Sequence, residues 1–394
     1  MATTLPVAAA GPQTQAHSAA APVAIPWHVP AVLIAATCAV IGVTWDISWH
    51  RGIGRDTFWT PAHLMIYASG IIAGLTSGWL VLKTTFAGTP EERAASVSFW
   101  GFRGPLGAWV AIWGSFAMVA SAPFDNWWHD AYGLNVKILS PPHSILGLGF
   151  TSIELGALLM VTSFQNRAAS SLGKLPGYLV AFGAGVLLTN YSLFTFESNG
   201  FPNVAHNGVY YISSALAFPA VLTLGARAAK LRWPATFAAL VYMTITAVML
   251  WGLELLPATP GLAPVYREIT HMVPPPFPIL MIIPAVGVDW LMRRWQRRND
   301  WLLALGVGVT FVALLLVTQW YVSQFLISPA SENWFFGVGR WNYNSRPGPF
   351  EHEFWDLDPS RTIFVGKLAI AALAAATTSR IGLALGTWMS RVKR

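Results

Sequence analysis

Ten long apolar segments follow one another along the chain, and they limit the folds open to it. A helix crosses the roughly 30 Å of hydrocarbon in a bilayer with about 20 apolar residues, whereas membrane β-strands are short and alternate. Hydrophobic residues make up 54% of the 394 residues and charged residues 10%, against roughly 25% charged in a soluble domain. The sequence predicts an all-α, polytopic membrane bundle of about ten transmembrane helices. The expected spans are 29–46, 61–84, 106–123, 141–163, 175–196, 209–227, 235–255, 273–291, 301–325 and 362–384.

The distribution of charge predicts the orientation of this bundle. Ten crossings place both ends of the chain on one side, and that side holds 16 of the 24 Lys and Arg residues. The positive-inside rule then predicts that both termini are cytoplasmic and that the protein is a multi-pass protein of the cell (inner) membrane. Because topology explains the net charge of +7, the expected partner is the lipid bilayer and no nucleic-acid partner is expected.

Composition divides the chain into three regions. Residues 1–26 are rich in Ala and Pro and contain no Lys or Arg, which predicts a short disordered cytoplasmic tail. Residues 27–165 form a helical region with the candidate sites, and 166–394 add further helices with a Trp-rich outer loop at 328–361. This loop is expected to cover the outer face or dock a partner; the alternative is an interfacial aromatic belt. Cys38 is the only cysteine, which excludes disulfides within the chain and thiolate metal clusters.

Histidine is concentrated on the outer side of the predicted bundle. Neutral imidazole is the commonest metal ligand in proteins, so this side is expected to carry the chemistry, on the periplasmic or extracellular face. Seven of the nine His residues lie in outer loops or at outer helix ends: His50, His63, His129, His143, His206, His271 and His352.

The first outer junction places three potential ligands together. Asp46 and His50 are four residues apart, so they share one face at a helix end. Thr60 has the character of an N-cap and Pro61 that of a first helical residue. His63 then falls in the first turn of the next helix, from which it can face back toward Asp46.

The second outer junction repeats this arrangement. Asp125 and His129 have the same spacing, Ser140 takes the place of the Thr cap, and His143 follows in the first turn. The two patterns are Asp-x3-His-x12-His and Asp-x3-His-x13-His, which suggests duplicated helical hairpins.

Two imidazoles and one carboxylate suit copper, non-haem iron or a catalytic zinc with open coordination positions. The alternative is that these His and Asp residues are hydrogen-bonded to one another at wet helix ends and bind nothing. Haem ligation is disfavoured, because each His pair straddles a helix–loop–helix junction and haem does not need the carboxylate.

From Asp46 through Tyr67 the sequence resembles the C-type membrane component of the copper membrane monooxygenases, the particulate methane and ammonia monooxygenase family. The family has Arg-Asp-Thr followed by Phe-Thr-Pro-Ser-His where this chain has Arg-Asp-Thr at 55–57 and Phe-Trp-Thr-Pro-Ala-His at 58–63. The second junction is similar to the family pattern Asn-x3-His-x13-His. The resemblance covers roughly residues 30–165.

The resemblance implies that Asp46, His50 and His63 hold one copper ion. It also implies a second, catalytic copper site at Asp125, His129 and His143, where Asp125 replaces an Asn of the family and adds an anionic ligand. The implied activity is oxygen-dependent hydroxylation of a small apolar substrate, with an external electron donor and other monooxygenase-type subunits as partners. The alternative function is a non-catalytic metal-binding, assembly or transport membrane protein.

Glu154 is an ionisable residue within the predicted fourth span. It follows His143 by eleven residues, which places both on nearly the same helix face. Because an ionisable group is costly in the membrane, a functional role is expected, and we predict a proton relay from the second site. The alternative is a protonated carboxyl group bonded to a neighbouring helix.

Overall fold

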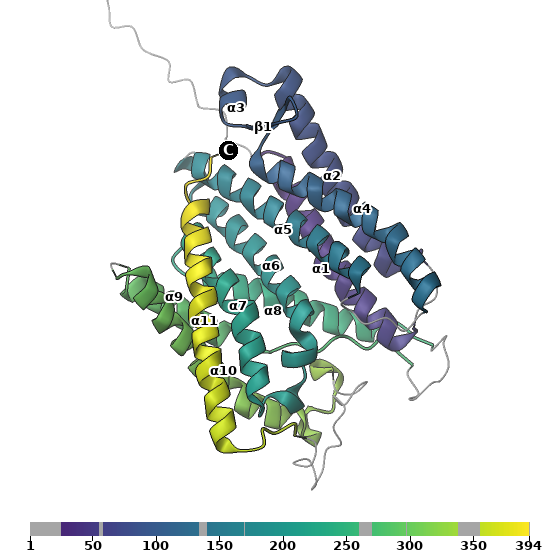
Figure 1. The fold of residues 1–394 in the computed structure, drawn as a ribbon, viewed down its shortest axis with the longest axis vertical. Coiled ribbons are helices and arrows are strands. Elements are labelled where there is room, and N and C mark those ends of the chain that lie inside the picture. The colour runs from purple at the N-terminus through teal and green to yellow at the C-terminus, as the bar shows by residue number, and fades with distance from the viewer. Residues whose placement is uncertain are drawn as a thin grey trace, which may run out of the picture.

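The chain forms a helical bundle, seen here in a computed structural model (Figure 1). The structure describes residues 25–54, 58–133, 140–168, 170–259, 270–296, 298–337 and 355–393, so nearly all of the predicted tail lies outside the described residues. In these ranges the strands are limited to one antiparallel hairpin, β1 (Val97–Phe99) with β2 (Phe102–Gly104).

Nine helices in the described part of the chain are long and apolar enough to cross a membrane. They have 21 to 29 residues, and at about 1.5 Å per residue each is at least roughly 30 Å long. The chain is therefore a multi-pass, all-α membrane protein, as the sequence predicts. The nine helices are α1 (His28–Gly52), α2 (Pro61–Ala87), α4 (Leu106–Tyr132), α5 (Pro141–Arg167), α6 (Leu175–Asn199), α7 (Gly208–Ala228), α8 (Pro234–Glu254), α10 (Asp300–Leu326) and α11 (Arg361–Met389).

The remaining helical elements are short. They are α3 (Pro90–Ala94), α9 (Ile282–Arg294) and the 3-10 turns η1 (Ser170–Leu172), η2 (Pro202–Val204), η3 (Pro329–Ser331) and η4 (Trp334–Phe336).

The eighth predicted span differs from the prediction. Instead of a helix over 273–291, residues 272–278 are non-helical and α9 begins only at Ile282. The reason is the proline content of the segment 274–278, since proline has no amide hydrogen to donate and restricts the residue before it. With 13 residues, α9 is about 20 Å long and cannot cross a bilayer alone.

The irregular segment and α9 together run the length of α8. At one end His271 pairs with Pro257, just beyond the last residue of α8. At the other end Asp289 accepts hydrogen bonds from the amides of Ala235 and Thr236 in the first turn of α8, at 3.1 and 2.7 Å. The eighth crossing is therefore present but discontinuous.

With this crossing, both ends of the described chain lie on the same side of the bundle. We name the side with the start of α1 and the end of α11 the terminal face. The opposite side carries the α1–α2 and α4–α5 connections, and we name it the junction face.

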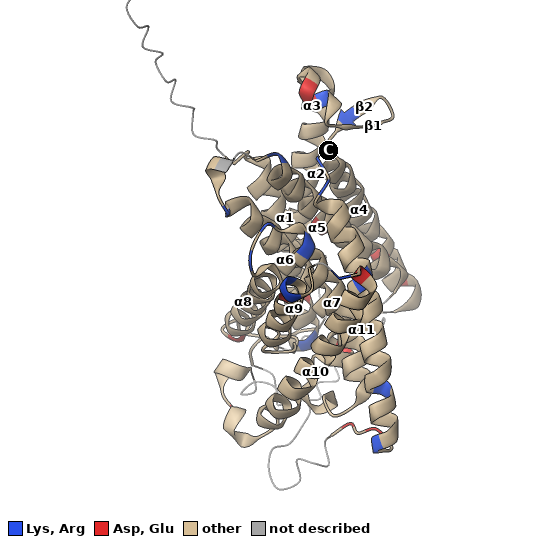
Figure 2. Cartoon of the chain, turned by 90° about the vertical axis from the view of Figure 1, so that its left-hand side faces the viewer, with Lys and Arg blue, Asp and Glu red and all other residues tan. Residues whose placement is uncertain are grey.

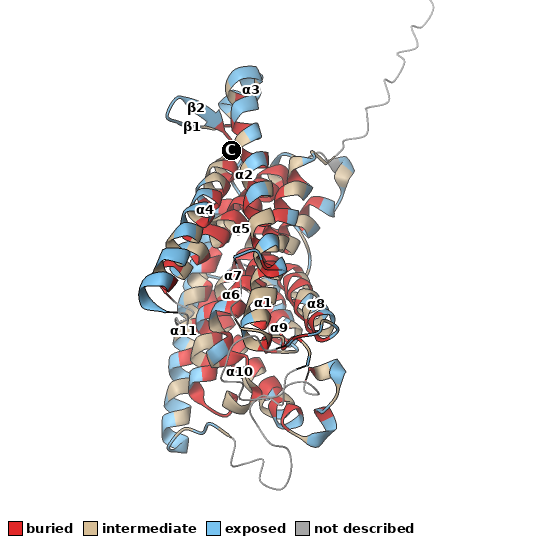
Figure 3. Ribbon diagram, turned by 90° about the vertical axis from the view of Figure 1, so that its right-hand side faces the viewer, coloured by how far each residue is buried: buried red, intermediate tan, exposed pale blue. Residues whose placement is uncertain are grey.

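The largest of the four hydrophobic core clusters among the described residues crosses the predicted boundary near residue 165. It joins Leu33 of α1 and Leu158 of α5 to Phe218 of α7 and Phe311 of α10, all buried. In Figure 3 the buried residues line the interior faces of the helices and the exposed residues face outward.

The described ends of the Trp-rich loop pack against helices of the second half of the chain. The Trp251 Nε1 of α8 donates to the Phe335 carbonyl oxygen at 3.0 Å. The Asp356 amide donates to the Asn203 carbonyl oxygen at 3.1 Å. Residues 338–354 lie outside the described residues, so the prediction that this loop covers the outer face stays a prediction.

Candidate metal centres

The first junction is capped as the sequence predicts. Thr60 is the N-cap of α2, and its side chain accepts a hydrogen bond from the His63 amide at 3.2 Å. Pro61 is the first residue of the helix, where its missing amide hydrogen costs nothing. This cap fixes the first turn of α2, and with it the direction in which His63 faces.

The first triad forms where the end of α1 meets this turn. Asp46 Oδ1 lies 3.1 Å from His63 Nε2, and Asp46 Oδ2 lies 3.7 Å from His50 Nε2. The Asp46 and His63 side chains are 23% and 24% exposed, whereas that of His50 is 45% exposed. The predicted triad therefore comes together, with one ligand open to solvent.

The second triad repeats this geometry between α4 and α5. Ser140 caps α5 and accepts from the His143 amide at 3.3 Å. Asp125 Oδ1 lies 3.3 Å from Nε2 of both His129 and His143. The His129 side chain is only 8% exposed, so the second triad is the more enclosed of the two.

The spacing of the donor atoms fits a metal ion. In each triad, one oxygen and two nitrogen atoms lie within 4.8 Å of one another. Two ligand atoms about 2 Å from a tetrahedral metal are themselves about 3.3 Å apart. The oxygen–nitrogen distances of 3.1 to 3.7 Å are close to this value, so small side-chain movements would complete either centre.

Two backbone carbonyls orient the imidazoles. His63 Nδ1 lies 3.0 Å from the Phe58 carbonyl oxygen, and His129 Nδ1 lies 3.2 Å from the Gly133 carbonyl oxygen. Because a carbonyl oxygen only accepts, Nδ1 must carry the hydrogen in both rings, and Nε2 is left to face the carboxylate. Such a contact on the far nitrogen is typical of metal-binding histidines.

The carboxylate oxygens support the same conclusion. Oδ1 of Asp46 and Oδ1 of Asp125 are buried, and among the described residues neither has a hydrogen bond of good geometry. Each nevertheless lies within 3.3 Å of an imidazole nitrogen. These oxygen atoms are therefore placed to share a cation with the neighbouring imidazoles, either a proton or a metal ion.

The two centres are neighbours. Asp125 of the second centre is close enough to His63 of the first for an electrostatic interaction between them. Tyr67 interacts electrostatically with both Asp46 and Asp125. The Tyr67 hydroxyl donates to the Phe58 carbonyl oxygen at 3.1 Å, the same atom that holds His63. Tyr67 was not among the predicted site residues, although its position one turn after His63 places it on the same helix face.

Close packing of α4 on α5 determines the distances between the ligands of the second centre, since these ligands come from both helices. A Cβ atom on Gly114 would lie 2.5 Å from the Gly149 carbonyl oxygen, and one on Gly107 would lie 2.4 Å from that of Gly156. The two backbones touch at these glycines, and any larger residue there would push the helices apart.

Glu154 lies in the interior of the bundle and is 1% exposed. Its Oε2 accepts from Asn190 Nδ2 of α6 at 2.8 Å, and the same amide donates to Thr151 Oγ1 at 3.1 Å. Oε1 is buried and has no hydrogen-bond partner among the described residues. A carboxyl group so placed is expected to be neutral and to carry its proton.

The other outer histidines do not join the triads. His206 is stacked between Trp320 and Trp355, with both ring-centroid distances 3.7 Å. His271 Nδ1 lies 2.9 Å from the Thr270 hydroxyl, and His352 lies outside the described residues.

The segment 55–57 of the first junction also lies outside the described residues.

No protein-family model, curated protein or solved structure matches this chain. The chemical indication of function is therefore the arrangement of Asp and His donor atoms at the two junctions.

Proposed function

We propose that this chain is a copper-binding membrane protein that holds one ion in each Asp/His/His triad. The observation that carries the proposal is the convergence of a carboxylate oxygen and two imidazole nitrogens at both junctions. Imidazole ligands suit copper, and the resemblance to the copper membrane monooxygenases favours it over iron and zinc, which accept the same donors.

The activity we propose is hydroxylation of a small apolar substrate that enters from the bilayer. Bound copper with open coordination positions would supply oxygen activation, and the overall reaction consumes O₂, two electrons and two protons and yields the alcohol and water. The electrons require an external donor, and other monooxygenase-type subunits are the proposed partners. The positive-inside rule would place the junction face outside the inner membrane.

The second triad is the proposed catalytic centre. His129 is the most enclosed of the ligands, and Glu154 lies three turns below His143 on the same helix. In this proposal Asp125, His129 and His143 hold the metal. Glu154, on the same helix as His143, supplies protons toward this centre from its neutral carboxyl group.

The first test is the copper content of the full chain purified in native lipid. His50→Ala and His129→Ala are each expected to remove about one ion per chain. His271→Ala is the matched control, because it removes a junction-face histidine outside both triads. If the wild type binds neither copper nor iron when these are supplied, the proposal is wrong.

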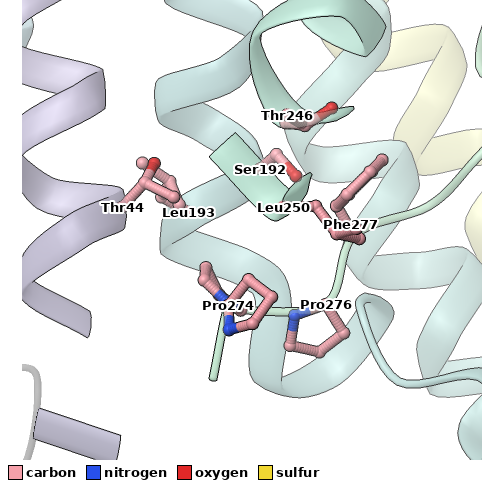
Figure 4. A pocket seen from close by; sticks show the side chains of 9 residues that line it. Thr44, Ser192, Leu193, Thr246, Leu250, Pro274, Pro276 and Phe277 are labelled. Atoms are coloured by element: carbon pink, nitrogen blue, oxygen red, sulfur yellow. The ribbon is translucent and has the colours of Figure 1, made fainter. Parts of the chain in front are cut away.

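A transport function is the second candidate, and the discontinuous eighth crossing favours it. Broken helices mark binding sites in transporters, and irregular backbone at membrane depth is tolerated where it is buried or lines a cavity. Here the proline segment lines a small cavity with Thr44, Ser192 and Thr246, which has room for about one water molecule (Figure 4).

Proteoliposomes separate the two candidates. Copper that accumulates inside the vesicles, and stops doing so with His129→Ala, would support transport. Copper that stays bound to the protein without flux would support the oxidation proposal.

A further inference from the structure

A second feature of the fold is a cavity of about 220 Å³ on the terminal face, between the beginnings of α6 and α8. It lies at the opposite end of the bundle from the metal triads, so it is independent of the function proposed above. The residues of its wall that matter here are Lys174, Tyr178, Arg232, Trp233, Phe237 and Leu240.

The cavity wall has a charged rim and an apolar interior. Lys174 immediately precedes α6 and Arg232 lies two residues before α8, and both are exposed. Further into the membrane the wall consists of Tyr178, Phe237 and Leu240. Tyr178 and Phe237 pack edge to face with ring centroids 5.0 Å apart. The cavity is therefore charged at its rim and apolar in its interior, as a phospholipid is charged at its headgroup and apolar in its acyl chains.

The charges around the rim favour an anion. Arg293 of α9 lies over the Trp233 ring at 4.8 Å and adds a third cation. The nearby carboxylate of Asp289 is buried, and it accepts from the Ala235 and Thr236 amides and from the Thr236 hydroxyl. These hydrogen bonds turn Asp289 toward the first turn of α8. Figure 2 shows basic residues around α6 and α9 at this end of the bundle.

We propose that this cavity binds an anionic phospholipid from the leaflet on the terminal face. Lys174 and Arg232 would bind its phosphate group, and an acyl chain would lie along Tyr178, Phe237 and Leu240. Basic pockets between transmembrane helices are typical binding sites for anionic headgroups. The apolar wall below the rim gives a lipid an advantage that a soluble anion lacks.

The test uses the full chain, purified in detergent and depleted of lipid. Phosphatidylglycerol is titrated in and the unfolding temperature is followed, with phosphatidylcholine of the same acyl chains as the comparison. Lys174→Gln combined with Arg232→Gln is expected to raise the half-saturating phosphatidylglycerol concentration roughly twenty-five-fold, since each basic residue contributes about a fivefold change. Arg298→Gln combined with Arg391→Gln is the matched control. It removes the same charge from exposed positions of the terminal face outside the cavity and should leave the titration unchanged.

Three results would overturn the proposal. In the first, phosphatidylcholine stabilises the wild type as well as phosphatidylglycerol does. In the second, the control pair weakens the response as much as the cavity pair, which would indicate general surface charge. In the third, glycerol phosphate alone reproduces the stabilisation, which would indicate a soluble anion. If the double variant does not fold, Arg232→Gln alone tests the same point, with an expected change of roughly fivefold.

Discussion

Asp46 Oδ1 lies 3.1 Å from His63 Nε2, across the junction between two helices. The opposite nitrogen of His63 donates to the Phe58 carbonyl oxygen, so the ring cannot turn its only hydrogen toward the carboxylate. The facing nitrogen can take up a second proton and pair with the carboxylate, or give its lone pair to a metal ion. In the second centre, His129 stands in the same relation to Gly133 and Asp125.

Copper binding should therefore release protons. Because the metal replaces the proton between Asp46 and His63, we expect the first centre to release about one proton at neutral pH. Calorimetric titration in buffers of different ionisation enthalpy measures this number. A binding heat that is the same in all buffers would contradict the proposed tautomers.

Asp125→Asn should weaken metal binding at the second centre while leaving the first unchanged. The amide keeps the shape of the side chain and removes the anionic ligand. We expect a loss of affinity of at least about tenfold, because even a partner that only orients a metal ligand contributes on the order of ten- to a hundredfold. A competition titration with a copper chelator gives the affinity. Asp130→Asn is the control, since Asp130 is exposed on the same helix and accepts from Asn126 at 3.3 Å.

Gly114→Ala should damage the second centre from a distance. The added methyl group meets the Gly149 carbonyl oxygen, and such overpacking typically costs about 1–3 kcal/mol. Separation of α4 from α5 would move Asp125 away from His143, so we expect lower stability and the loss of one copper ion. Gly78→Ala is the control, because its Cβ would meet nothing within 4 Å. Equal stability and copper content in the two variants would show that the contact between Gly114 and Gly149 does not determine the geometry of the second centre.

Glu154→Gln tests the proposed proton route. The Gln oxygen can still accept from Asn190, so we expect the copper content and unfolding temperature of the wild type. Oxidation should be slowed by roughly a hundredfold or more, the usual scale for a lost proton-transfer group. Glu154→Leu instead leaves the buried Asn190 amide without this acceptor and should cost about 1–3 kcal/mol of stability. Wild-type turnover by Glu154→Gln would indicate that the carboxyl group only holds α5 against α6.

His206 predicts a pH dependence of stability. Burial between two Trp rings lowers the pKa of its imidazole below the ordinary 6.5, against the opposing contact with the Trp320 carbonyl oxygen. Between the lowered pKa and 6.5 the unfolded chain binds more protons than the folded chain, so stability rises with pH through this window and levels off above it.

The check is the unfolding temperature from pH 5 to 8. His206→Phe should keep the stack between the two Trp rings and reduce the slope. A slope that His206→Phe leaves unchanged would assign the pH dependence to other groups.

Much of the fold could be predicted from the sequence, because its signals are local. The length of each apolar run predicts a span, and the cap-and-proline pairs at 60–61 and 140–141 predict the first residue of α2 and α5. The prediction was less accurate where the apolar run and the helix end at different residues. The third span was expected to end at 123, but α4 continues to Tyr132 and carries Asp125 and His129 on its last turns.

The residues of the two triads could also be predicted from the sequence. In each triad, an Asp and a His at i, i+4 spacing and a His in the first turn of the next helix bring three side chains to one junction. Only the tertiary structure decided the rest. Examples are the Asn190 partner of Glu154, the approach of Gly114 to Gly149, and the cavity beside Lys174. Each depends on how a helix is placed and rotated against its neighbour. No local pattern of residues specifies a contact between segments far apart in the chain, and the packing of the whole bundle fixes it.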